Sequence, residues 1–315
     1  MSAPDWLVQI AGILVALAAA PLFMGWVNKC RAWLQNRSAP SLLLPYRAIR
    51  KLFHKDAVIA RNASPLFRLA PYIVFGSMLT AAAVVPALGT RLPFTRAADA
   101  IALVGLFAVA RMFLSLAAMD IGTAFGTLGA RREMMIGFLA EPALLMVIFV
   151  ASLISATTAL PAISDHIATQ EFAIYPSLAF TGVAFVLVLL AENARIPVDN
   201  PATHLELTMI HEAMLLEYSA RHLALMEWAA ALKLLNYACI GFALFIPWGV
   251  ATTHTPLALG VAVLALAAKL VLAGVGLAVI ETISAKLRVF RVPEFLAVAF
   301  LFAVLGLLVH LLLGA

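Results

Sequence analysis

The chain has 315 residues, of which 64% are hydrophobic and 12% charged, and its mean hydropathy is +1.03. A soluble globular domain carries about 25% charged residues, so this balance excludes a domain whose main solvent is water. The net charge of +5 does not indicate nucleic-acid binding, because the basic residues are confined to particular loops between apolar segments.

Eight apolar segments approach or exceed the length of about 20 residues that a helix needs to cross a bilayer. They cover residues 6–27, 69–89, 100–119, 137–160, 172–191, 223–248, 256–280 and 295–313. No basic residue precedes the first segment, so we expect a retained span there and not a cleaved signal peptide. We therefore predict an all-α, polytopic membrane protein with one integral membrane domain, residues 1–315, whose termini lie on the same side.

The basic residues predict the orientation in the membrane. Most of the 21 Lys and Arg residues lie in the loops at residues 29–68, 120–136, 192–222 and 282–293, whereas the loops on the opposite side hold only Arg91 and Arg96. The positive-inside rule then places the first four loops in the cytoplasm and both termini outside. In the first of these loops, residues 41–55 mix apolar and basic side chains, which favours an interfacial amphipathic helix over a merely solvated charge run.

The two cysteines, Cys30 and Cys239, are isolated and form no CxxC pair. They offer no site for an iron-sulfur cluster, a zinc ion or a [NiFe] centre, and we do not expect them to form a disulfide. We predict that this chain binds no redox cofactor of its own, so any redox metal must lie in a partner.

Five charged residues fall inside the predicted spans: Arg111, Glu141, Glu227, Lys233 and Lys269. A charge at the centre of a membrane helix costs about 2.5 to 3.5 kcal/mol, so we expect these side chains to face the interior of the bundle. Each could form a structural ion pair, and Arg111 and Glu227, nearer the helix ends, could instead extend to the interface. Lys233 and Lys269 lie midway along their spans, which favours a role in proton transfer.

The loop at residues 192–222 is the most informative part of the chain. Pro197 and Pro201 forbid a continuous helix, so we expect a break after the fifth span and a restart near Thr203. Asp199 or Asn200 could then cap the new helix.

This loop concentrates five acids between apolar residues: Glu192, Asp199, Glu206, Glu212 and Glu217. On a regular helix, Glu206 and Glu217 would share a face about three turns apart. Carboxylates crowded in a partly dry place can hold and release protons near neutral pH. The alternative is a solvated acidic face.

Metal binding at this loop is not expected, although His204 and His211 lie close to acids in sequence. The zinc-protease pattern would need a second histidine at position 215, where this chain has Leu215.

Several motifs of this chain together resemble the complex I subunit 1 family, closest to its formate hydrogenlyase and hydrogenase-4 (group 4 [NiFe] hydrogenase) branch. They are Glu192-Asn193-Ala194-Arg195-Ile196-Pro197-Val198-Asp199-Asn200-Pro201, Ala202-Thr203-His204-Leu205-Glu206, His211-Glu212-Ala213-Met214, Leu216-Glu217-Tyr218-Ser219, Ala140-Glu141-Pro142 and Phe290-Arg291-Val292-Pro293-Glu294. The chain departs from the family pattern at Ala39, Leu44, Ala48 and Ala220, the last standing where a glycine is usual.

The resemblance implies an eight-helix subunit, without a redox centre of its own, in an oxidoreductase or translocase complex. It would dock the soluble electron-transfer arm through its cytoplasmic loops and link redox chemistry to proton or sodium translocation. Expected partners are hydrophilic hydrogenase-like large and small subunits carrying iron-sulfur clusters, with or without a [NiFe] centre, as well as antiporter-like membrane subunits and lipid. The predicted ion pathway comprises Glu141, Glu192, Asp199, Glu206, Glu212, Glu217, Lys233 and Lys269, and the predicted docking residues are Arg37, Arg47, Arg50 and Lys51.

Two alternatives are kept. A quinone-reactive complex I subunit would line a quinone channel beside the amphipathic helix, and a stand-alone secondary transporter would use the buried Lys and Glu residues for substrate coupling. The absence of a visible inverted repeat weighs against the transporter.

Overall fold

A computed structural model describes residues 3–90, 93–94, 99–169, 176–199, 209–251 and 255–313. In these ranges the secondary structure is helical apart from isolated bridges that join Gly89 to Ala251 and Asp99 to Ala159. The prediction of an all-α protein is confirmed.

Seven helices in the described ranges are long and apolar enough to cross a membrane. They are α1 (Ala3–Leu34), α3 (Pro65–Val84), α4 (Ala100–Asp120), α5 (Ala124–Ser155), α9 (Ala220–Phe245), α10 (Pro256–Ile283) and α11 (Val292–Leu313). The fifth predicted span corresponds to α7 (Pro176–Glu192), which is apolar and has 17 residues. Three short helices, α2 (Leu44–Phe53), α6 (Leu160–Thr169) and α8 (His211–Leu215), lie between these spans in sequence. A polytopic membrane protein is therefore the correct fold class.

The start of α5 differs most from the prediction. The helix begins at Ala124, well before the expected residue 137, and includes Arg131, Arg132 and Glu133. These residues lower the hydropathy but are compatible with a helix, and Arg and Glu are good helix formers. Hydropathy therefore predicts the start of the apolar span near residue 137, although the helix itself begins at Ala124.

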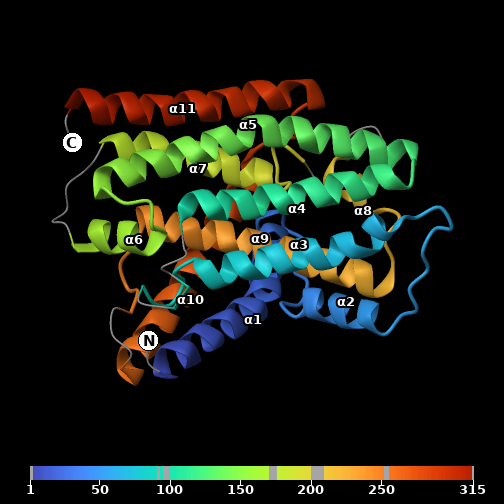
Figure 1. Ribbon diagram of the computed structural model, residues 1–315, viewed down its shortest axis with the longest axis horizontal. Coiled ribbons are helices and arrows are strands. Elements are labelled where there is room, and N and C mark those ends of the chain that lie inside the picture. The colour runs from blue at the N-terminus through green and yellow to red at the C-terminus, as the bar shows by residue number, and fades with distance from the viewer. Residues whose placement is uncertain are drawn as a thin grey trace.

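The long helices pack side by side along the longest axis of the molecule (Figure 1). Helix α7 packs on α5 and α11, α4 lies between α3 and α5, and α9 contacts α3 and α1. Helix α10 contacts chiefly α1, and these two run obliquely at one edge of the bundle (Figure 1). The start of α1 and the end of α11 lie toward the same end of the bundle (Figure 1).

The predicted amphipathic helix forms as α2. Its Ile49 is buried, whereas Arg47, Arg50 and Lys51 are exposed. Phe53 at its end meets Trp228 of α9 edge to face, with ring centroids 6.4 Å apart. The helix is therefore held against the bundle by its apolar side and presents its basic side outward.

Two cytoplasmic loops of the predicted topology are tied together beside α2. The Ser219 hydroxyl accepts a hydrogen bond from the Val58 amide at 3.0 Å and donates one to the Val58 carbonyl at 2.7 Å. The Tyr218 ring stacks on Phe67 at 4.1 Å between centroids, and its hydroxyl donates to the Phe67 carbonyl. Burial raises the pKa of Tyr218, which keeps this donor neutral. These contacts fix the loop that precedes α9.

Ala220, the first residue of α9, has a φ of 49° and is buried. This left-handed conformation favours glycine, the residue usual at this position in the resembling family. The backbone geometry is therefore kept even where the residue departs from the pattern.

Candidate functional site

A buried guanidinium lies at the centre of the candidate site. The Arg111 side chain of α4 is 5% exposed and is surrounded by three carboxylates. Its Nη1 atom lies 2.5 Å from Oε1 of Glu141, its Nε atom lies 3.6 Å from Oε1 of Glu133, and its Nη2 atom pairs with Oε1 of Glu192. Glu133 and Glu141 belong to α5, and Glu192 is the last residue of α7. Three helices therefore meet at one cation.

Gly137 of α5 makes room for this cation. A Cβ atom at Gly137 would overlap Nη1 of Arg111 and would lie 2.8 Å from its Cδ atom. The same helix therefore supplies both the carboxylates that bind Arg111 and the space that it occupies.

Lys233 of α9 adds a second cation to the network. Its Nζ atom lies 3.0 Å from Oε2 of Glu192, so the two oxygens of this carboxylate face different cations. The Glu192 side chain is 1% exposed, whereas that of Lys233 is 16% exposed. We call these five residues, Arg111, Glu133, Glu141, Glu192 and Lys233, the Arg111 network.

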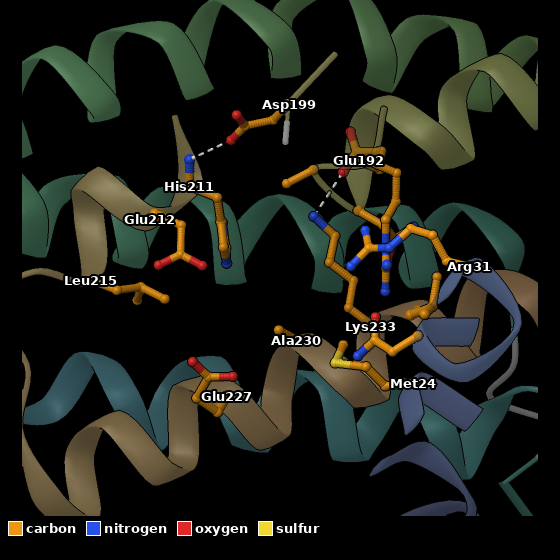
Figure 2. A pocket seen from close by; sticks show the side chains of 15 residues that line it. Met24, Arg31, Glu192, Asp199, His211, Glu212, Leu215, Glu227, Ala230 and Lys233 are labelled. Atoms are coloured by element: carbon orange, nitrogen blue, oxygen red, sulfur yellow. Dashed lines mark hydrogen bonds and ion pairs between the residues drawn. The ribbon is translucent and has the colours of Figure 1, made fainter. Parts of the chain in front are cut away.

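A cavity of about 230 Å³ extends from the Arg111 network toward the loops around α8. Glu192 and Lys233 lie on one side of it, and His211, Glu212 and Glu227 lie on the other (Figure 2). The walls thus carry several ionisable groups at close quarters.

Asp199 holds the loop on one side of this cavity. Its carboxylate accepts hydrogen bonds from the backbone amides of Ile210 at 3.3 Å and His211 at 3.2 Å, and it pairs with Lys286 at 3.4 Å. These amides are at the start of α8, so a carboxylate there also opposes the positive end of the helix backbone.

Glu281 of α10 pairs with two arginines, Arg31 and Arg195, that line the cavity. One of its oxygens lies 3.1 Å from Nη1 of Arg195 and the other lies 3.3 Å from Nη1 of Arg31. Burial lowers the pKa of Arg195, and the Glu281 carboxylate opposes that shift. One acid therefore ties α1, α10 and the loop after α7 together.

The structure places five of the eight predicted pathway residues either in the Arg111 network or on the wall of this cavity. Glu141, Glu192 and Lys233 belong to the Arg111 network, while Asp199 and Glu212 line the cavity. Glu206 lies outside the described residues.

Glu217 is exposed in a turn after α8. Helix α8 ends at Leu215, so Glu217 is not on a helix. It therefore cannot share a helical face with Glu206, as the sequence predicted.

Lys269 is placed elsewhere. Its Nζ atom donates to the carbonyl of Ile246 at 2.6 Å and lies 5.8 Å from the centre of the Phe242 ring. The ion pairs among the described residues do not connect it to the Arg111 network.

Sequence reasoning missed three charged residues and left the position of a fourth open. Glu133 fell in an expected loop, and Glu281 fell one residue beyond an expected span. Arg195 was quoted only as part of a motif. Arg111 does not extend to the interface but is buried among carboxylates. An earlier start of α5 would have placed Glu133 on the same helix as Glu141.

The predicted docking residues Arg37, Arg47, Arg50 and Lys51 are all exposed. No group of three or more potential metal ligands occurs in the described part of the chain, which leaves out His204 and Glu206.

Comparison with known proteins places this chain in a family. The sequence matches a family model described as NADH dehydrogenase over residues 8–312. Formate hydrogenlyase subunit 4 of Escherichia coli (strain K12) is 34% identical over 293 residues, which are 93% of this chain and 94% of that protein. Hydrogenase-4 component C of the same organism is 34% identical over 241 residues, or 76% of this chain and 75% of that protein.

A solved structure has the same fold. A chain of the membrane-bound sulfane sulfur reductase, an archaeal respiratory membrane complex, superimposes with a TM-score of 0.80 at 18% identity, covering 96% of this chain and 99% of that one. The family match and the two relatives together show that this chain belongs to the NADH dehydrogenase family of complex I subunit 1-type membrane proteins.

Proposed function

We propose that this chain is the membrane-anchor and ion-coupling subunit of a formate hydrogenlyase- or hydrogenase-4-type complex in a bacterial or archaeal inner membrane. It docks hydrophilic hydrogenase-like subunits on its cytoplasmic loops, lies beside antiporter-like membrane subunits, and has both termini outside. Iron-sulfur clusters and any [NiFe] centre belong to its partners. The two relatives that match along most of the chain support this assignment.

The observation that carries the proposal is the cavity that ends on the Glu192–Lys233 pair. It extends from that pair to loop residues such as Asp199 and Glu212. A conformational or charge change at the docked arm could therefore reach the Arg111 network through a continuous set of ionisable groups, without a metal in this chain.

The charges of the Arg111 network suit ion movement. If its two cations and three carboxylates are all ionised, one negative charge remains uncompensated. An uncompensated charge in a low-dielectric interior is costly, so binding a proton or a sodium ion there removes the imbalance. The pathway that we propose comprises Glu141, Glu192 and Lys233, followed by Asp199, Glu206, Glu212 and Glu217 toward the loops. The extension to Lys269 stays a separate prediction.

Docking is assigned to the basic outer side of α2 and the loop before it. Arg47, Arg50 and Lys51 project from a helix that is anchored by Ile49, and Arg37 is exposed nearby. A rigid helix with exposed basic groups presents a fixed surface to an acidic partner.

The quinone-channel alternative is less well supported by the cavity. Ligand pockets usually enclose about 300 to 1,000 Å³ and are mostly apolar. This cavity is smaller, at about 230 Å³, and several of its lining residues are charged. Quinone bound to the purified complex, or inhibition by quinone-site blockers, would favour the alternative. Transport by the chain reconstituted alone would favour a stand-alone transporter.

Lys233→Gln in the intact complex is the sharpest test. Glu192 keeps its pairing with Arg111, so the complex should assemble and its soluble subunits should still transfer electrons. We expect coupled ion transport into membrane vesicles to fall at least ten-fold. Lys29→Gln is the matched control, because it removes the same charge from a lysine outside the network, where the Lys29 Nζ atom lies 5.0 Å from the centre of the Trp33 ring.

Unchanged transport in Lys233→Gln would refute the coupling role. Failure of this variant to assemble, while Lys29→Gln assembles, would instead show that Lys233 is a structural ion pair.

A further inference from the structure

A wide apolar groove lies between α7, α9 and α10, away from the Arg111 network. Its volume is about 380 Å³, larger than the charged cavity. Phe185, Gly182, Ala238, Phe245 and Ala273 are among the residues that line it, and the described residues contribute no charged or polar side chain to its walls. It arises because α10 packs chiefly on α1 and α7 packs on α5 and α11, so that neither follows α9 closely.

The size of the groove decides what can occupy it. One turn of an α-helix, about 10 Å across and 5.4 Å long, fills on the order of 400 Å³. A transmembrane helix of a partner, which needs several turns, would therefore lie mostly outside the space that the groove encloses. A flexible hydrocarbon chain fits a space of this size and makes no demand for hydrogen bonds.

One end of the groove carries a positive charge. Ile246, a groove residue, caps the C-terminus of α9, where helix carbonyls lack intrahelical partners. Lys269 donates to this carbonyl at 2.6 Å and lies above the ring of Phe242, another groove residue. An ammonium has three donors, so this bond leaves donors for a second acceptor.

The same end has the character of a membrane interface. Trp248 follows two residues after Ile246 and is 43% exposed, and tryptophan is enriched where helices leave the hydrocarbon region. In the described part of the chain no carboxylate forms an ion pair with Lys269. Lys269 is therefore a partly exposed cation directly above an apolar groove.

We propose that this groove holds one acyl chain of an anionic phospholipid whose phosphate lies against Lys269. The apolar walls bind the chain, and Lys269 selects a headgroup of net negative charge over a zwitterionic one. The lipid fills the gap between α9 and α10 and so completes the packing of this edge of the bundle.

The test uses the intact complex purified in detergent and incubated with photoactivatable phosphatidylglycerol or phosphatidylethanolamine, each with a diazirine on the acyl chain. We expect phosphatidylglycerol to label residues 178–189 and 234–246 preferentially. One lysine near a membrane surface contributes about 1 kcal/mol toward an anionic lipid, so Lys269→Gln should reduce phosphatidylglycerol labelling about five-fold. Labelling by phosphatidylethanolamine should change little.

A second variant tests the chain-binding walls separately from the charge. A Cβ atom at Gly182 meets its nearest neighbour, Phe245, at 3.6 Å, so Gly182→Leu should fold while filling the groove and should abolish labelling by both lipids. The matched controls are Lys29→Gln for the charge and Gly105→Leu for the glycine, since a Cβ at Gly105 has nothing within 4 Å.

Several results would overturn the proposal. Labelling of the groove that is no stronger than labelling of other lipid-facing segments would show that no specific site exists. Equal labelling by both lipids in the unmodified complex would remove the role of Lys269. Loss of groove labelling on addition of a quinone, but not of phosphatidylglycerol, would show that the occupant is a quinone.

Discussion

Gly137→Ala is the smallest change that tests whether Arg111 organises the charged site. The added methyl group would overlap the Arg111 guanidinium, and because the competing atoms belong to two packed helices, we expect the guanidinium to move. No charge is removed, so any effect arises from the position of Arg111 alone.

The magnitude follows from two opposing contributions. Replacing glycine by alanine inside a helix stabilises it by about 1 kcal/mol. Disrupting a buried ion pair so that a charge loses its partner costs about 3 to 5 kcal/mol. We therefore expect Gly137→Ala to lower the free energy of unfolding by about 2 to 4 kcal/mol and to impair coupled ion transport.

Unfolding by titration with sodium dodecyl sulfate in mixed micelles measures this change. Gly105→Ala in α4 is the control, since its methyl group would meet no atom within 4 Å and only the helix-propensity gain of about 1 kcal/mol should remain. If the two alanine variants were equally stable, Arg111 would not be held in place by close packing, and the reasoning about the network would fail.

Two further changes test other parts of the structure. Ala220→Gly should raise the free energy of unfolding by about 0.5 to 1 kcal/mol, because glycine adopts the φ of 49° without the steric cost of a Cβ atom. A lower free energy of unfolding in the same titration would contradict this. Replacing Arg47 and Arg50 by Glu reverses two charges of the proposed docking surface. During affinity purification of the complex, the hydrophilic subunits should then dissociate at a lower salt concentration. Unchanged retention of these subunits would place the docking surface elsewhere.

The energetic cost of charges in a membrane made much of the site predictable from sequence. Glu141 and Lys233 stood out because each interrupted an apolar span, and the structure turns both toward the same buried network. The same argument placed Lys269 in the interior, but cost alone does not name a partner. Its ammonium binds the exposed end of α9, a contact that depends on the tilt of α10 and could not be seen in the sequence.

The partners that were missed come from positions where hydropathy gives no signal. Glu133 lies in the first part of α5, before the apolar stretch of that helix. Glu281 lies near the C-terminus of α10. Each pairs with an arginine from a different helix or loop, and such pairs are set by tertiary packing. Residue type and spacing along one helix therefore identify the candidates but not the connections.

The connections show which ion pair can open and close. Arg111 is 5% exposed, and its partners Glu133 and Glu192 are 7% and 1% exposed, so breaking either of these two pairs leaves buried charges that cannot reach water. Lys233 differs, since it lies at the cavity wall with 16% of its side chain exposed, and Glu192 would remain paired with Arg111 if Lys233 moved away. Movement of Lys233 into the cavity thus exposes one cation to acidic loop residues at a lower cost than breaking the pair between Arg111 and Glu192. If Arg111 stays fixed and Lys233 moves, a change at the docked arm can remove one of the two cations that face Glu192. The helices around Glu192 then stay in place.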